Sequence, residues 1–297
     1  EKLKEEKKLL KNDKLNHSYP HSWRSKAPLI YRATPQWFIS MEKNSLRNKA
    51  IKAIGDTSFY PEKGKDRLLS MIEDRPDWCV SRQRVWGVPL PIFINKKTKE
   101  PLRDKKVIER IAEIYEKEGS DCWFTDDAKK FLGDKYNPEE FEKLQDIVEV
   151  WFDSGSTHSF VLEKRKDLKW PADMYLEGSD QHRGWFHSSL LESCGTRGRA
   201  PFNSILSHGF VVDGKGLKMS KSTGNVTSPE DILKNYGADI LRAWVASSDY
   251  AEDLRIDKTI LSQHAESYRK IRNTFRFILG NINDRFEPKS LKSIEIQ

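Results

Sequence analysis

One segment, residues 174–186, constrains the fold of this chain most strongly. It begins with Met174–Leu176, an apolar run typical of the end of a buried strand, and a helix is expected over 183–194. Polar residues and a glycine fill the turn between them: Glu177, Gly178, Asp180 and Gln181. Open α/β sheets bind ligands at the carboxyl ends of their strands, where such a turn lies. The segment therefore predicts an α/β fold with a ligand site at this turn.

The residue types in the turn suit a polar ligand. Glu177 and Asp180 offer carboxylates to a cationic amine, Gln181 offers both a donor and an acceptor, and Gly178 permits close backbone approach. The structural alternative is a capped helix start, in which Asp180 only accepts hydrogen bonds from backbone N–H groups. Glu177 lies too early in the segment for such a cap.

A second segment, Lys218-Met219-Ser220-Lys221-Ser222, places two lysines in a loop between glycine-containing turns at 213–216 and 223–225. Two ammonium groups at this spacing can bind a polyphosphate and stabilise a departing pyrophosphate. The alternative is a solvated basic loop. An apolar run before the loop and a helix starting at Ser228 favour a fixed position. The chain contains no G-x-x-x-x-G-K-[ST] sequence, so a P-loop ATPase is disfavoured.

The lysine loop resembles the K-M-S-K-S signature of class I aminoacyl-tRNA synthetases. Four further strings resemble the isoleucyl-tRNA synthetase branch of that family: 32–38 (R-A-T-P-Q-W-F), 75–89, 150–158 and 177–186 (E-G-S-D-Q-H-R-G-W-F). The motifs keep the family's order and the resemblance runs from about Ser18 to about Phe286. Specificity for valine or leucine is the alternative within the class.

The resemblance implies a role for each motif residue. Glu177 would bind the α-ammonium or ribose region of isoleucyl-adenylate, with Gly178, Asp180 and Gln181 completing the polar cradle. Trp151 and Trp185 would form the walls of the isoleucine side-chain pocket, although two core tryptophans are the alternative.

The nucleotide part of the site is implied in the same way. Lys221, and after it Lys218, would contact the ATP phosphates and act in catalysis, with Met219 in the same loop. His208 and Gly209 would lie near the adenine, although a histidine packed in the core is the alternative for His208. ATP with Mg²⁺ is expected as a substrate, and no metal site built from this chain is expected.

The resemblance also implies the architecture. The chain would be the C-terminal half of a Rossmann-type parallel-sheet catalytic domain, with a small charged insertion and the start of an all-helical domain. The expected parts are a segment returning from an editing insertion (1–40), catalytic core (41–96), a small connective insertion (97–148), the catalytic half with both motifs (149–250), and the start of the anticodon-binding domain (251–297).

Local patterns predict individual elements within these parts. Apolar residues at helical spacing predict an amphipathic helix over 105–118, and Ser228-Pro229 followed by two acids predicts a helix start. Strands are expected over 27–32 and 36–41. From Ile256 onward, an apolar stripe from Ile260 to Leu279 predicts a long helix.

Composition limits the partners. The formal net charge of +7 suits a polyanion such as tRNA. Three separated cysteines without a C-x-x-C spacing exclude a cysteine zinc site and suggest a reducing compartment. No apolar run approaches the length of a membrane span, so we expect a cytoplasmic protein.

The expected reaction is ATP-dependent activation of isoleucine to isoleucyl-adenylate and transfer to tRNA(Ile). The family's H-I-G-H motif does not occur in the chain. We therefore expect a fragment that lacks the H-I-G-H half and the editing domain and has little activity alone. Two alternatives stay open: a non-catalytic module that binds adenylate or tRNA, and a synthetase-like paralogue with an accessory role.

Overall fold

The computed structural model describes residues 1–22, 25–221 and 223–282, which form two compact units. The first unit spans Glu1–Trp37, and its described residues contain helix α1 (Lys2–Glu5) and a bridge between His21 and Pro28. The strand predicted over 27–32 was wrong. Its apolar side chains Leu29, Ile30 and Tyr31 are exposed, so no packing partner among the described residues stabilises an extended ladder there.

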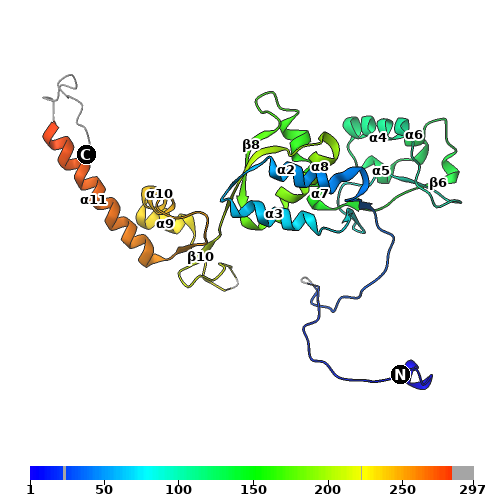
Figure 1. The fold of residues 1–297 in the computed structure, drawn as a ribbon, viewed down its shortest axis with the longest axis horizontal. Coiled ribbons are helices and arrows are strands. Elements are labelled where there is room, and N and C mark those ends of the chain that lie inside the picture. Colours follow the sequence, from blue (N-terminus) through cyan, green and yellow to red (C-terminus); the bar gives the residue numbers. More distant parts are fainter. Residues whose placement is uncertain (23–24, 222, 283–297) are drawn as a thin grey trace. The chain divides into compact units, whose positions relative to one another are not determined.

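The second unit begins at Phe38 and is built on a parallel sheet of three strands in the order β2-β9-β8 (Figure 1). These strands are β2 (Ser58–Tyr60), β9 (Phe202–His208) and β8 (Ala172–Gly178), and both pairings are parallel. The expected parallel α/β architecture is confirmed. Because parallel strands end at the same edge, the last residues of β8 and β9 lie side by side.

Three helices accompany this sheet: α2 (Leu46–Gly55), α3 (Lys63–Glu73) and α8 (Trp185–Arg197). Helix α3 packs against β2, and α2 packs against both α3 and α8. Helix α8 is the most deeply buried, with Phe186, Leu190, Leu191 and Cys194 all 0–1% exposed. It ends at Gly198, whose left-handed φ of +77° glycine adopts without a Cβ penalty. The helix predicted over 183–194 is thus confirmed, shifted by two or three residues at each end.

Short elements connect this core to the turn that precedes α8. Strand β1 (Phe38–Ile39) pairs with β3 (Trp78–Cys79), and β4 (Ser81–Arg82) pairs with β7 (Ile147–Val148). The strand predicted over 36–41 is therefore reduced to two residues. The other short elements are helix α7 (Val150–Gly155), the π-helical turn η3 (His158–Leu162) and the 3-10 turn η4 (Ser179–His182).

The charged segment between β5 (Phe93–Asn95) and β6 (Phe141–Lys143) forms a small core of its own. The predicted amphipathic helix is α4 (Lys105–Glu118), which buries Val107 and Ile111. Asp104 caps it by accepting a hydrogen bond from Lys106 N at 2.9 Å. The remaining elements are α5 (Cys122–Thr125), α6 (Ala128–Leu132) and η2 (Pro138–Glu140).

Beyond the sheet, β10 (Val211–Asp213) pairs in parallel with β11 (Leu254–Ile256). Helices α9 (Pro229–Tyr236), α10 (Ala238–Ala246) and α11 (Lys258–Ile282) follow the lysine loop. The predicted long helix is confirmed as α11, and its apolar stripe is largely exposed. Leu261 is its only buried residue, and Ile271, Phe275, Ile278 and Leu279 are exposed because the described residues provide no packing partner there. Residues 283–297 and Ser222 lie outside the described residues.

The predicted start of α9 gives a direct test of the fold. Ser228 Oγ accepts a hydrogen bond from Asp231 N at 3.1 Å, and Pro229 occupies the first helical position. Replacing Ser228 by alanine should lower the free energy of unfolding by about 1 kcal/mol, whereas glycine should cost only a few tenths. Urea denaturation of this chain, followed by circular dichroism, measures both. Equal losses for the two variants would show that the cap contributes nothing.

Candidate functional site

The carboxyl ends of β8 and β9 bring two of the predicted motifs together. Glu177 is in register with Ser207, and Gly178 is in register with His208, although 30 residues separate each pair in sequence. The side chains of Glu177 and Asp180 are exposed at this edge, and Gly178 is buried. The predicted cradle and the predicted adenine-proximal residues thus lie at neighbouring positions on adjacent strands.

The turn after β8 is closed by Gln181 rather than by Asp180. Gln181 Oε1 accepts a hydrogen bond from Trp185 N at 2.9 Å, at the start of α8. Neither η4 nor α8 has a side-chain cap on its N-cap residue, so the alternative in which Asp180 caps the helix is not what forms. Asp180 Oδ2 accepts a hydrogen bond from Gln181 Nε2 at 3.3 Å, and its carboxylate stays at the surface.

The two predicted pocket tryptophans approach this turn from different elements. Trp185 stacks on Tyr175 with ring centroids 4.0 Å apart, and its Nε1 donates to Ser154 O at 3.0 Å. An ideal Cβ on Gly184 would lie 2.9 Å from the Trp151 ring, so Trp151 lies over this glycine. Trp151 is 41% exposed. Trp185 is therefore packed on its rear side, while Trp151 presents an open ring face.

His208 and Gly209 end β9 in a fixed arrangement. His208 Nδ1 lies 2.7 Å from the Gly209 carbonyl oxygen. The ring therefore donates through Nδ1, which leaves Nε2 as the free ring nitrogen for a ligand. An ideal Cβ on Gly209 would collide with the backbone oxygen of Glu252, so the close approach of these backbones requires glycine.

Phe210 is a residue of this edge that sequence reasoning missed. Its ring lies 3.4 Å from an ideal Cβ on Gly178, and its side chain is 46% exposed. An aromatic ring beside a backbone that can approach a ligand closely is a suitable packing surface for a flat or apolar group. The signal in the sequence was the aromatic residue directly after His208-Gly209.

The lysine loop is organised by Asn225. Its Oδ1 accepts from Ser220 N at 2.9 Å, and its Nδ2 donates to Asp213 Oδ2 at 2.9 Å and to Lys218 O at 3.2 Å. Asp213 also accepts a hydrogen bond from Leu217 N at 2.8 Å. The pKa of Asp213 is lowered, mainly by the hydrogen bond from Asn225. The polar groups of the loop therefore bind one another, which fixes the backbone on which the lysines stand.

The lysine side chains themselves project from this scaffold. Lys218 and Lys221 are exposed, and neither forms an ion pair with the described residues. Met219 is half-buried and packs against the cluster of Ile232, Trp244, Ile256 and Leu261. Two cations are thus presented to solvent while Met219, one of the two residues between them, anchors the loop.

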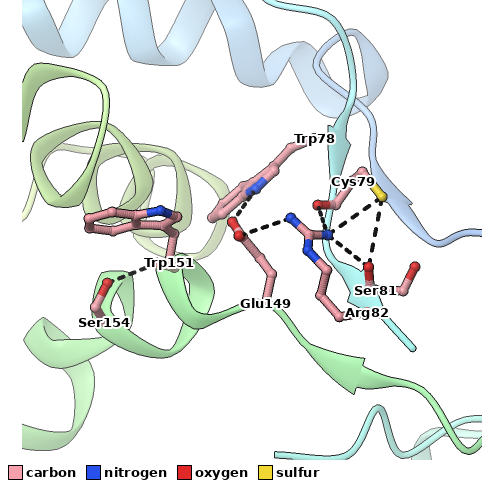
Figure 2. A network of polar contacts seen from close by, with 7 residues as sticks. All are labelled: Trp78, Cys79, Ser81, Arg82, Glu149, Trp151 and Ser154. Carbon is pink, nitrogen blue, oxygen red and sulfur yellow. Dashed lines mark hydrogen bonds and ion pairs between the residues drawn. The ribbon is translucent and has the colours of Figure 1, made fainter. Parts of the chain in front are cut away.

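A buried polar network precedes the helix that carries Trp151 (Figure 2). Glu149 is 7% exposed, and its two carboxylate oxygens accept from Trp78 Nε1 at 2.8 Å and from Arg82 Nη2 at 3.1 Å. Arg82 Nη1 also donates to the carbonyl oxygens of Cys79 and Ser81. These hydrogen bonds connect β3 and β4 to Glu149, the residue directly before α7. No periodic pattern in the sequence predicted this network.

A second acid, Glu192 of α8, is half-buried against the end of α7. Its Oε1 has no hydrogen-bond partner among the described residues and lies so close to Gly155 that a Cβ there would collide with it. It lines a cavity of about 390 Å³ together with His158, Trp78 and Phe152. Burial, followed by the charges of Asp153 and Glu149, raises the pKa of Glu192 to about 9.

Glu192 should therefore make stability depend on pH. Because the Glu192 carboxyl has a pKa of about 9 in the folded chain and 4.5 in the unfolded chain, the folded chain holds this proton to higher pH. The contribution of Glu192 to the free energy of unfolding is therefore complete below pH 4.5 and is lost as the pH rises toward 9. Glu192→Gln keeps the neutral form, so its unfolding free energy should rise relative to the parent chain between pH 5 and pH 8. The gain cannot exceed about 1.4 kcal/mol per pH unit. Urea denaturation at three pH values measures it.

The matched control for this experiment is Glu163→Gln. The exposed Glu163 pairs with Arg197 at 2.8 Å, which lowers its pKa, so its contribution is lost toward acid pH instead. A difference between the Glu192→Gln variant and the parent chain that does not change with pH would show that Glu192 is ionised in the folded chain.

The described residues contain no group of three or more His, Cys, Asp or Glu side chains arranged to hold a metal ion. Among the helices described here, none is both long and apolar enough to cross a membrane.

Comparison with known proteins gives a consistent family match. Residues 3–257 match the family model described as tRNA synthetases class I (I, L, M and V). An isoleucine--tRNA ligase of Pelagibacter ubique is 76% identical over 297 residues, which is 100% of this chain and 33% of that protein. One from Syntrophotalea carbinolica is 56% identical over 97% of this chain and 31% of its own length. The chain spans about a third of the length of the curated relatives it matches.

Among solved structures, a Mycobacterium tuberculosis methionyl-tRNA synthetase bound by methionyl-adenylate is similar with a TM-score of 0.53. The alignment covers 85% of this chain and 41% of that one at 17% identity. At this identity the likeness concerns the fold alone, and it agrees with the parallel sheet described above.

Proposed function

The chain belongs to the class I tRNA synthetases of the isoleucine, leucine, methionine and valine group, and from that premise we propose that it supplies the isoleucine-activating site of an isoleucyl-tRNA synthetase. The reaction is attack of the isoleucine carboxylate on the α-phosphate of ATP, which enters with Mg²⁺ as a substrate. The P–O bond to pyrophosphate breaks as the acyl-phosphate bond forms. A ribose hydroxyl of tRNA(Ile), the 2′-hydroxyl in the class I pattern, then attacks the adenylate carbonyl and releases AMP.

The observation that carries this proposal is the register of Glu177-Gly178 with Ser207-His208. It gathers a carboxylate for the substrate ammonium, a glycine that permits close approach and a histidine ring at one sheet edge. Trp151 and Trp185, with one open and one supported ring, suit a branched apolar side chain beside that cradle. Isoleucine is preferred over valine or leucine because the 76% identical relative is an isoleucine--tRNA ligase.

This chemistry needs no side-chain nucleophile. Catalysis would come from positioning of the two substrates and from cations that follow charge onto the departing pyrophosphate. Lys218 and Lys221, exposed on a loop whose backbone is fixed by Asn225, are suited to that role.

A second function applies to the chain by itself. Because it matches only about a third of its relatives, it is also a candidate adenylate-binding module that does not turn over alone. Activity is therefore best tested in a reconstituted ligase, defined as the 76% identical relative with its matching third replaced by this chain. Exchange by the reconstituted ligase but not by the chain alone supports both statements.

The pocket assignment predicts a selective defect. In the reconstituted ligase, Trp151→Ala should raise the KM for isoleucine by about 10- to 100-fold, which corresponds to the ~1.5–3 kcal/mol lost when an apolar contact of this size is removed. The KM for ATP should change little. Steady-state ATP–pyrophosphate exchange measures both constants.

Trp170→Phe is the matched control, because Trp170 precedes β8 at the opposite end of the strand. If Trp151→Ala raised the two KM values together, Trp151 would support the fold of the site rather than contact isoleucine.

A further inference from the structure

The loop that joins β4 to the segment before β5, residues 83–88, is anchored at its base. Val148 N donates to Val88 O at 2.7 Å, and Gln83 Nε2 donates to Asp146 Oδ2 at 3.1 Å. Gly87 has a φ of +149°, and an ideal Cβ there would collide with Ile147 Cδ1. Both ends of the loop are therefore fixed against the strand that leads into α7.

The tip of this loop, Arg84-Val85-Trp86, is nevertheless open to solvent. Trp86 is 91% exposed, and Val85 is exposed completely. Arg84 is exposed and forms no ion pair with the described residues. Tryptophan is rarely left in water to this extent, and an apolar tip on an anchored loop indicates an interaction surface.

The surroundings of the tip link it to the proposed site. The three tip residues line a cavity of about 950 Å³ together with Val150 and Asp153, which flank the pocket residue Trp151. The acids in the cavity are Asp121, Glu149 and Asp153. Glu149 is paired with Arg82, and burial, with the charge of Glu149 second, raises the pKa of Asp153. The rim of this cavity, which reaches the start of α7, thus carries a cation without an ion pair among the described residues and an exposed indole two positions further along the chain.

We propose that the Arg84–Trp86 tip binds the unpaired 3′ end of the tRNA, with the indole stacked on a base and the guanidinium on a phosphate. The inference rests on the proposed function, because transfer requires that end to reach the adenylate. Unpaired RNA is recognised by base stacking on aromatic rings and by cations along the backbone, and the tip offers one of each. A purely apolar protein segment would leave Arg84 without a partner.

The test separates the two half-reactions in the reconstituted ligase. Trp86→Ala should slow single-turnover transfer of isoleucine from preformed adenylate to tRNA by about 5- to 100-fold, the range expected for loss of one stacked base. Isoleucine-dependent ATP–pyrophosphate exchange should stay within about twofold of the parent. Trp86→Phe should restore most of the transfer rate, and Ile108→Ala, which truncates an exposed apolar side chain on α4 outside the tip, should leave the rate unchanged.

A binding measurement identifies the occupant. Trp86→Ala should weaken binding of intact tRNA but not of tRNA from which the unpaired 3′ nucleotides have been removed. Equal weakening of both, or of neither, overturns the proposal. A parallel fall in exchange and transfer also overturns it, because the tip would then hold another segment of the protein. Exchange that does not depend on isoleucine in the parent would instead contradict the proposed function.

Discussion

Replacing Lys221 by alanine should slow adenylate formation by about 30- to 1000-fold in the reconstituted ligase. The lysine is exposed on a loop whose backbone is fixed by Asn225, so its removal should leave the loop in place. A cation that acts on charge developing in the transition state contributes roughly 2–4 kcal/mol, which corresponds to that range of rates. Binding of isoleucine, which we propose to occur at the sheet edge, should change far less. Pre-steady-state pyrophosphate release gives the rate, and its dependence on isoleucine gives the affinity.

The control is Lys234→Ala, which removes an exposed lysine from α9 directly after the loop. It tests whether a general loss of positive charge explains the effect. If Lys221→Ala reduced rate and isoleucine affinity by the same factor, the lysine would not act selectively in the transition state, and the assignment would be wrong.

Glu149 should have the largest effect on stability. Glu149→Ala removes acceptors from Trp78 Nε1 and Arg82 Nη2, and it leaves the buried indole N–H unpaired. Such a loss costs about 2–4 kcal/mol, with the lower part of the range favoured because Arg82 is 41% exposed and can be hydrated. Urea denaturation of this chain measures the loss.

Two further variants give stability losses with which the loss for Glu149→Ala can be compared. Glu149→Gln keeps an acceptor for Trp78 and should cost less than alanine. Glu163→Ala removes an ion pair near the surface and should cost at most about 1 kcal/mol. A cost for Glu149→Ala no greater than that for Glu163→Ala would show that the network of Figure 2 is not a stabilising element.

Elements with strong local signals were predicted well from the sequence. Helix α4 has its apolar residues on one face, and α9 starts at a serine cap followed by proline, so both are encoded within a few residues. The strand β8 and the helix α8 also follow from an apolar run and a turn. Packing with distant segments was not needed to find them.

The errors have a common physical cause. Leu29, Ile30 and Tyr31 have strand-forming side chains, but a strand requires a pairing and packing partner that local sequence does not specify. Strand pairing is equally non-local, so β1 was expected to be longer than the two residues that pair with β3. Local patterns predict which face is apolar, and the rest of the fold decides whether it is buried.

The sequence was sufficient to select the motif residues of the candidate site, but not to predict the contacts between them. Sequence reasoning selected Glu177, Asp180 and Gln181 together, but it could not tell which of them closes the start of α8; the structure gives that contact to Gln181. Phe210, Glu149 and Glu192 were missed because their importance comes from neighbours 30 or more residues away in sequence. The roles of the residues in catalysis and substrate binding stay predictions.

Isoleucine-dependent ATP–pyrophosphate exchange by the reconstituted ligase tests the central claim most directly. Valine and leucine at equal concentration provide the comparison, and the parent relative provides the reference rate. We predict exchange with isoleucine at a rate near that of the parent, and much weaker exchange with the other two amino acids. Exchange that favours valine or leucine, or no exchange from a folded reconstituted ligase, would contradict the assignment of this chain to isoleucine activation.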